Sequence, residues 1–158
     1  MSDYKADRRD LARDSFGAHI LVDPAERSPF DVWREVRVDR GLWGPAVVFE
    51  CVGAAGLVQK IVDSAEMGTR IYCAAGWYTG DTLNITDATR QGVTLQFGGG
   101  PHPQDWYGTL DAIVAGRLDP MPSVGKIITL DEVPNALDLA RKSDGPPRIV
   151  VHPNGDTS

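Results

Sequence analysis

Residues 46–53 read AVVFECVG, and this stretch decides the fold class. Its first seven residues form a nearly continuous β-prone run, which Gly53 ends. Strands buried on both faces of a sheet have this composition, because neither face meets water. We therefore expect a central parallel strand here. Glu50 is the exception within the run: a buried carboxylate needs a partner, so we expect it to face the end of the sheet or a neighbouring subunit.

The patterns on either side alternate between helix and strand. Apolar residues recur at helical spacing from Leu57 to Ala65, and Gly68 is expected to close that helix. Further strands are expected at residues 19–22, 70–75, 93–97 and 148–151, and further helices at residues 7–16, 28–36, 87–90, 106–114 and 131–140. The last helix is expected to turn four residues inward, namely Val133, Ala136, Leu137 and Ala140. This order predicts an α/β fold, an incomplete Rossmann-like doubly wound parallel sheet with flanking helices.

Length and composition indicate a folded globular protein. The chain has 158 residues, of which 42% are hydrophobic and 24% charged, values close to those of soluble globular domains. We expect one domain over residues 1–152 and a frayed tail at residues 153–158. The longest apolar runs fall well short of the roughly 20 residues of a membrane helix, and the first residues are polar and charged, so a spanning protein and a secretory signal are excluded.

Charge and cysteine content indicate which classes of partner and which cellular compartment suit this protein. The 22 acidic residues outnumber the 16 basic ones, which makes nucleic acid and anionic membranes poor partners. Cys51 and Cys73 lie within apolar runs, where we expect small buried side chains and neither a disulfide scaffold nor a cysteine-rich zinc site. These features favour a cytoplasmic protein.

Several sequence motifs follow one another in a recognisable order. The segments are AVVFECVG, GTRIYCAAG, GVTLQFGGG, AGRLDP, LDEVPNALDLARK and GPPRIVVHP, preceded by SDYKADRRDLARDSFGAHILVDP. Together they cover essentially the whole chain, and in this order they resemble the zinc-containing alcohol dehydrogenases, the medium-chain dehydrogenase family. The resemblance implies the C-terminal, cofactor-domain portion of such an enzyme, with NAD as the cofactor.

The resemblance assigns nine residues to that cofactor. Asp3 falls where the family has the acidic residue that binds the adenosine ribose, and a carboxylate there favours NAD over its phosphorylated form. Arg8 resembles the basic residue that covers this ribose, and Arg148 matches one that contacts the pyrophosphate. The other six match the ends of three strands: Val52 and Gly53 beside the ribose, Ala74 and Ala75 at the nicotinamide, and Phe97 and Gly98 at its carboxamide.

Simpler structural roles remain open for several residues. Asp3 is equally compatible with a terminal residue or a helix N-cap, and Arg148 with a solvated residue near a strand end. Residues 53–56 suit a strand-to-helix turn better than a pyrophosphate loop, and residues 98–100 suit a loop. Trp106 and Tyr107 are expected to be core and helix surface.

The chain also departs from the family pattern. The fingerprint GxGxxG, which places the pyrophosphate at a helix N-terminus, would lie before Met1, and so would the first strand of the sheet. The family's zinc ligands belong to a separate N-terminal domain, so zinc is expected only there. His19, His102 and His152 are far apart in the sequence and have no ligand spacing. We expect no catalytic residue in this chain.

Two functions follow as expectations. The first is the NAD-binding portion of an alcohol dehydrogenase-like oxidoreductase, which transfers hydride between an alcohol and NAD in the complete enzyme and is inactive alone. The second is a non-catalytic dimerising or weak nucleotide-binding module derived from a dehydrogenase. The resemblance also implies a homodimer through the strand from Val93 to Phe97, and the first function implies a complementing N-terminal chain.

Overall fold

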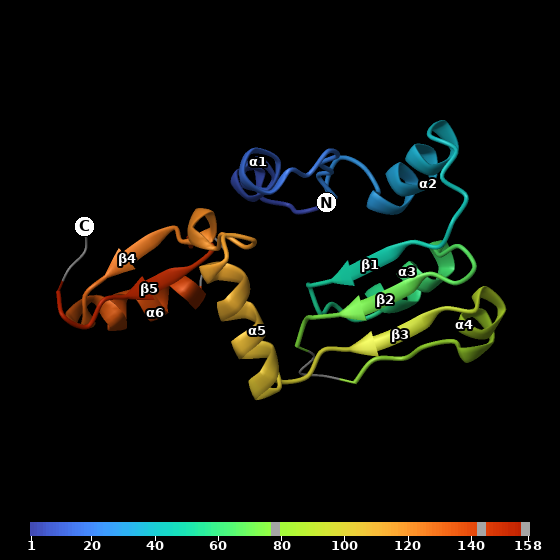
Figure 1. Cartoon of the computed structure of the whole chain (residues 1–158). Helices are drawn as coiled ribbons and strands as arrows, with labels where there is room; N and C mark the ends of the chain where they lie inside the picture. Colours follow the sequence, from blue (N-terminus) through green and yellow to red (C-terminus); the bar gives the residue numbers. More distant parts are fainter. Residues whose placement is uncertain (77–79, 142–144, 156–158) are drawn as a thin grey trace. The chain divides into compact units, whose positions relative to one another are not determined.

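The computed structural model describes residues 1–76, 80–141 and 145–155. The chain divides into two compact units, which are described separately below. The first unit combines Met1–Asp23 with Asp105–Ser158, and the second is Pro24–Gln104. Figure 1 shows the elements of both units. The loop prediction at Trp77–Thr79 and the tail prediction at residues 156–158 lie outside the described residues.

The second unit is built on a three-stranded parallel sheet. Its strands are β1 (Val47–Glu50), β2 (Arg70–Cys73) and β3 (Thr94–Phe97), in the order β1-β2-β3. The register pairs Glu50 with Cys73 and Cys73 with Phe97, so all three strands end at the same edge (Figure 1). The parallel direction is as expected. The expected central place of β1 is wrong for this chain, because β1 pairs with only one described strand.

Three helices belong to the same unit. They are α2 (Pro29–Asp39), α3 (Leu57–Ser64) and α4 (Ile85–Gln91). Ser28 caps α2 through its hydroxyl oxygen, with proline at the first helical position, as the sequence predicts. Helix α3 ends earlier than expected: Ala65 is its C-cap, and Gly68, at φ +77°, lies in the turn before β2.

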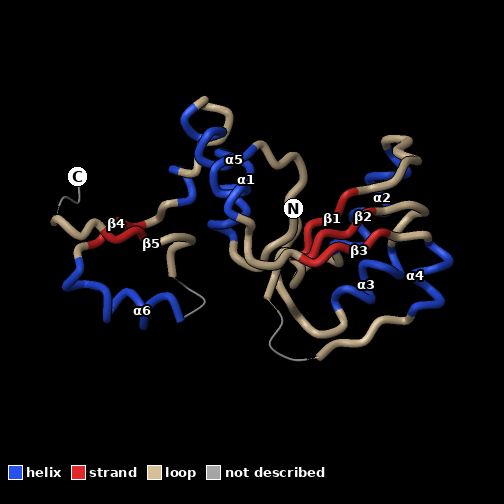
Figure 2. Tube along the Cα trace, turned by 60° about the horizontal axis from the view of Figure 1, so that its bottom comes forward, coloured by secondary structure: helices blue, strands red, loops and turns tan. Residues whose placement is uncertain are grey.

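The core of this unit lies between the sheet and α3. Val62 and Cys73 are fully buried and Ile71 is 1% exposed, while Ala88 of α4 packs against the same cluster. Figures 1 and 2 show α3 and α4 on one face of the sheet. The opposite face is open, because Phe49 is 68% exposed. The expectation that β1 is buried on both faces is therefore wrong.

The first unit contains a short two-stranded parallel sheet. It pairs β4 (Lys126–Ile128) with β5 (Ile149–Val151). Its helices are α1 (Ala6–Phe16), α5 (Pro103–Val114) and α6 (Val133–Arg141), with single 3₁₀ turns η1 (Met121–Ser123) and η2 (Leu130–Glu132). Gly17 ends α1 in the left-handed conformation at φ +69°, as predicted. Helix α5 begins at Pro103, within the second unit as the contacts divide the chain.

Several predictions for the first unit are wrong in detail. The strand expected at residues 19–22 is reduced to one parallel bridge between Ser2 and Val22, and β4 has no counterpart among the predicted strands. The helix expected from residue 131 starts with a 3₁₀ turn. Leu137 is 59% exposed and Trp106 is 62% exposed, so neither is a core residue.

These elements agree with the predicted fold class. The strands of both sheets are parallel and connected through helices, which is a partial Rossmann-like α/β fold. Within the described ranges, no helix combines the length and the apolar character that crossing a bilayer requires.

Candidate functional site

Three turns meet at the carboxyl edge of the sheet in the second unit. One residue separates Val52 and Gly53 from β1, and Ala74 and Ala75 follow β2 directly. Phe97 is the last residue of β3, and Gly98 follows it. The pairing of Glu50 with Cys73 and of Cys73 with Phe97 brings the three turns to one edge. In open parallel sheets, ligands bind in the crevice at this edge. The structure thus gathers six of the nine predicted residues: Val52, Gly53, Ala74, Ala75, Phe97 and Gly98.

The turn after β1 is held by a side chain. The Oε1 atom of Glu50 accepts hydrogen bonds from the amides of Val52 at 2.7 Å and Gly53 at 2.8 Å. Glu50 is only 2% exposed, and its Oε2 atom has no hydrogen-bond partner among the described residues. Glu50 therefore faces the end of the sheet, one of its two expected positions, and its partners are the turn's own amides.

The turns after β1 and β2 touch each other. The main-chain oxygen of Glu50 accepts from the amides of Ala74 at 2.8 Å and Ala75 at 3.2 Å. Gly53 has φ +71°, and a methyl group on its Cα would lie 2.6 Å from the carbonyl oxygen of Gly76. Only glycine tolerates both the positive φ and this approach. Residues 54–56 continue as the strand-to-helix turn into α3, as predicted.

The third turn is less enclosed. The Phe97 side chain is 63% exposed, while the amide of Gly98 donates to the oxygen of Cys73 at 2.8 Å. A methyl group on Gly98 would lie 3.0 Å from the Tyr72 hydroxyl and 3.2 Å from the Cys73 oxygen. Gly98 thus lets the chain pass close to β2, and residues 98–100 form a loop, as predicted.

The two cysteines differ in burial. Cys73 is fully buried, as expected, whereas Cys51 is exposed, which corrects the prediction for it. Cys51 is the first residue after β1, where the chain leaves the sheet. Partial loss of solvation raises the pKa of both thiols, that of the exposed Cys51 included, and the nearby charge of Glu50 raises the two pKa values further. Neither thiol is therefore an activated nucleophile at neutral pH.

Asp3 and Arg8 lie together in the first unit. The Arg8 guanidinium is 3.9 Å from Oδ2 of Asp3, and the Asp3 side chain is 24% exposed. The other carboxylate oxygen accepts from the amide of Lys5 at 2.8 Å, just before α1 begins. Asp3 therefore forms a local turn, and the alternative that it is a helix N-cap is wrong, because the N-cap of α1 is Lys5. Arg9 donates to the main-chain oxygen of Asp3 and pairs with Asp23 at 3.0 Å.

Arg148 is the ninth predicted residue and precedes β5 in the first unit. Its main-chain oxygen accepts from the amide of Gly125 at 2.9 Å, and its side chain is exposed. The predicted residues therefore form two groups, three in the first unit and six in the second.

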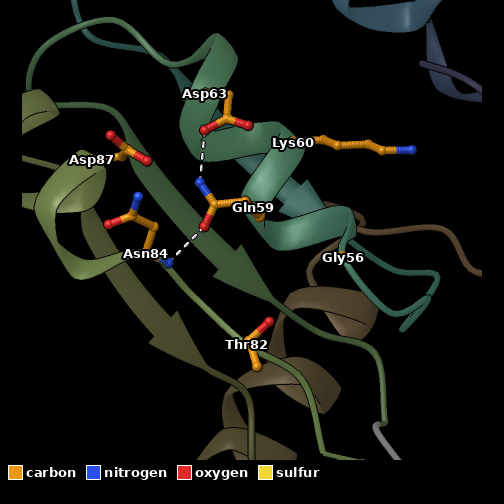
Figure 3. Close-up of a pocket in the computed structure, with 7 residues that line it drawn as sticks. All are labelled: Gly56, Gln59, Lys60, Asp63, Thr82, Asn84 and Asp87. Carbon is orange, nitrogen blue, oxygen red and sulfur yellow. Dashed lines mark hydrogen bonds between the residues drawn. The ribbon is translucent and has the colours of Figure 1, made fainter.

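A polar hollow of about 520 Å³ lies elsewhere, beside α3 and α4. Figure 3 shows Gln59 between Asp63 and Asn84, to which it is hydrogen bonded. None of the predicted cofactor residues lines this hollow. Its seven lining residues include no hydrophobic or aromatic side chain, whereas ligand pockets are lined mostly by such side chains.

Metal ligation has no candidate among the described residues. Within residues 1–76, 80–141 and 145–155, no group of three or more His, Cys, Asp or Glu side chains is close enough to hold an ion.

Sequence relatives belong to one class of enzyme. The chain is 24% identical over 93% of its length to (R,R)-butanediol dehydrogenase of Neisseria gonorrhoeae, and 29% identical over 82% to S-(hydroxymethyl)glutathione dehydrogenase of Escherichia coli. It spans 41% and 36% of these relatives' lengths, well under half of each. No protein-family model matches the chain. The resemblance to part of the zinc-type medium-chain alcohol dehydrogenases is nevertheless confirmed.

Solved structures agree on the fold. A 2R,3R-butanediol dehydrogenase from Bacillus subtilis superposes on 97% of the chain with a TM-score of 0.78 and 22% identity. A short chain alcohol dehydrogenase from Escherichia coli CFT073, complexed with cofactor NADH, superposes on 95% with a TM-score of 0.78 and 14% identity. The chain covers 43% of each of these structures.

Proposed function

We propose that this partial relative of the medium-chain alcohol dehydrogenases binds NAD and is the nucleotide-binding portion of an alcohol dehydrogenase-like oxidoreductase. One observation carries the proposal: the six predicted residues of the second unit lie at the carboxyl edge of a parallel sheet, where the turns after β1 and β2 touch each other and Gly98 bonds to the end of β2. That edge is where open α/β sheets bind nucleotides. The NADH complex of a protein with a similar fold supports the same ligand class.

The residues present fit a dinucleotide. Gly53 carries no side chain, so the turn after β1 can lie close against the main chain of Gly76 and present its backbone at the edge of the sheet. Asp3 offers Oδ2 to a ribose diol beside the positive charge of Arg8, and Arg148 offers an exposed guanidinium to phosphate. NAD, when bound, supplies the hydride chemistry. The residues of this chain would bind and orient it, and we propose that substrate activation requires the complementing N-terminal portion, so that the chain alone is inactive.

Calorimetric titration with NADH and NADPH tests the proposal. We expect tighter binding of NADH, because the Asp3 carboxylate repels a 2′-phosphate and accepts from the diol. In the variant Asp3→Asn, the ratio of the Kd for NADPH to the Kd for NADH should fall roughly tenfold, which corresponds to one hydrogen bond to a charged group. Asp7→Asn removes an exposed carboxylate from the first turn of α1, four residues from Asp3, so it is the matched control and should leave the preference unchanged. Millimolar or weaker binding of both nucleotides would refute the proposal.

Activity measurements test the proposal that the chain alone is inactive. The chain should show no alcohol-dependent reduction of NAD by itself. Hydride transfer from any alcohol would contradict the proposal that the chain lacks the groups that activate the substrate.

The proposed homodimer uses β3. This strand is the outermost of the described strands in the sheet, on the side opposite β1. Pairing of two outer strands satisfies their free backbone groups and extends the sheet. Sedimentation should therefore give twice the monomer mass, and Gln96→Lys, which places like charges on neighbouring paired strands, should shift the equilibrium toward monomer. A monomeric wild-type chain at 100 μM, about the concentration of a routine structural sample, would exclude a stable dimer.

A non-catalytic module is the second candidate function. The outer position of β3 favours it, because dimerisation needs no catalytic group. A stable dimer with no measurable nucleotide affinity would support this candidate over the first. We also propose a cytoplasmic location, supported by two cysteines that form no disulfide.

A further inference from the structure

Glu50 is a carboxylate where the sheet would otherwise place an apolar side chain. It is 2% exposed and pairs in register with Cys73, which is fully buried. Val48, two residues earlier on the same face, packs against the apolar core. Burying a carboxylate costs free energy unless its bonds compensate, so an apolar residue would suit stability alone.

The hydrogen bonds recorded for the oxygens of Glu50 go to four predicted cofactor residues. Its Oε1 atom accepts from Val52 at 2.7 Å and Gly53 at 2.8 Å. Its main-chain oxygen accepts from Ala74 at 2.8 Å and Ala75 at 3.2 Å. One residue thereby connects the turns after two strands. No other described residue is recorded as bonding to all four of these amides.

The connection also determines how the turns face each other. Gly53 is held at φ +71°, and a methyl group on its Cα would lie 2.6 Å from the carbonyl oxygen of Gly76, so the first turn packs closely against the second and has little room to rotate. The Oε1 bonds oppose that rotation. The second oxygen, Oε2, is buried without a hydrogen-bond partner in the described part of the chain. A purely structural brace would not need this uncompensated oxygen, and such orphaned groups in native structures call for a functional explanation.

We propose that Glu50 is a positioning residue for the nucleotide. It touches no ligand atom in this role: it holds the amides of Val52 and Gly53 so that the turn presents its outer surface to the ribose in one conformation. Preorganisation of this kind raises affinity because the turn does not have to be ordered when the ligand binds. The inference rests on the proposed NAD binding, and the experiment below separates the two.

The test compares three variants of the whole chain. Glu50→Met keeps the volume and removes the acceptor, and Glu50→Gln keeps one carbonyl oxygen. Val62→Ala removes fully buried apolar volume from α3 and leaves all the turn bonds in place, so it is the control for a general loss of stability. The readouts are amide hydrogen exchange at Val52 and Gly53, the Kd for NADH, and the midpoint of thermal unfolding.

The expected results differ between the variants. Exchange at Val52 and Gly53 should accelerate about ten- to a hundredfold in Glu50→Met and less in Glu50→Gln, because a neutral acceptor bonds more weakly than a carboxylate. The Kd for NADH should rise about tenfold in Glu50→Met, which loses the acceptor that orders the turn. In Glu50→Gln, which keeps one carbonyl acceptor, the Kd should be close to that of the wild type. Val62→Ala should unfold at a lower temperature with an unchanged Kd.

The outcomes separate the two proposals. A wild-type chain that does not bind NADH overturns the proposed function, and the positioning role falls with it. A wild-type chain that binds, together with a Glu50→Met variant of equal affinity, overturns the positioning role alone. A Kd that rises equally in Val62→Ala shows a general stability effect and also overturns it. If Glu50→Met does not fold, unchanged exchange at Val52 and Gly53 in Glu50→Gln has the same consequence.

Discussion

Replacing Gly53 by alanine tests the contact between the turns after β1 and β2. An alanine at φ +71° costs roughly 1–2 kcal/mol, the penalty of an L-residue in the left-handed region. Its methyl group would also lie 2.6 Å from the carbonyl oxygen of Gly76, a main-chain atom that must then move. Overpacking of this kind costs roughly 1–3 kcal/mol. The expected loss in the free energy of unfolding is the sum, roughly 2–5 kcal/mol.

Gly56 offers a matched control three residues away. It has φ +73°, almost the same backbone conformation, and nothing lies within 4 Å of the position of its missing methyl group. Gly56→Ala should therefore cost only the conformational penalty, roughly 1–2 kcal/mol. The difference between the two variants isolates the contact with Gly76.

Urea unfolding gives the two free energies. Because the chain has two compact units, the transition is best followed through backbone amide signals of β2, which report the second unit alone. Equal losses for Gly53→Ala and Gly56→Ala would refute the close approach of the two turns. An NADH titration of both variants then shows whether the same contact matters for binding, and we expect the larger effect in Gly53→Ala.

Three further predictions concern acid stability, thiol reactivity and packing. Hydrogen bonds from the amide of Thr129, the larger effect, and from Lys126 lower the pKa of the Glu132 carboxyl from its ordinary value of 4.5. The ionised carboxylate therefore stabilises the folded chain fully above about pH 4.5, and this stabilisation is lost as the pH falls through the folded pKa. Thermal unfolding of the wild type and Glu132→Gln should therefore differ at pH 7 and converge near pH 2.5, about two pH units below that ordinary value; a constant difference would contradict the linkage. Partial desolvation and the Glu50 charge raise the pKa of the exposed Cys51 thiol, so iodoacetamide at pH 8, about one pH unit below the ordinary thiol pKa, should modify it several-fold more slowly in the folded than in the urea-unfolded chain. Cys73 is buried and should react only after unfolding; mass spectrometry that finds both equally labelled in the folded chain would refute this. Val62→Ala should lower the free energy of unfolding by about 2–3 kcal/mol, from two lost methyl groups and the cavity they leave, whereas a loss under about 1 kcal/mol would show that Val62 is not packed in the core.

Local signals predicted most of the elements correctly. Pro29 begins α2 after its cap Ser28, and Gly17 ends α1 after Phe16; both positions are as expected. The weaker predictions fall where an element depends on a distant partner. The short strand β4 was missed because Lys126–Ile128 has too few residues for a pattern and exists only through its pairing with β5. The strand expected at residues 19–22 is a single bridge in the structure, because among the described residues only Ser2 pairs with it.

Burial was predicted less well than secondary structure. Phe49 and Trp106 are apolar enough for a core, yet both are exposed, because a face is buried only where another element covers it. Composition cannot show which faces are covered. The same limit explains the wrong prediction for Cys51. It belongs to an apolar run in the sequence, but it lies just after β1, where the chain leaves the sheet, and is exposed.

The sequence by itself determined the parallel α/β class, the order of the elements, the resemblance to alcohol dehydrogenases and the residues after each strand as the place to look for a ligand. These depend on side-chain periodicity and on turn residues within a few positions of one another. The tertiary structure decided which of those residues meet. Gly53 and Gly76 belong to different turns, and only the register of β1 against β2 brings them together. The same register gives the main-chain oxygen of Glu50 its bonds to the turn after β2, because contacts between strands more than twenty residues apart are set by packing and not by local pattern.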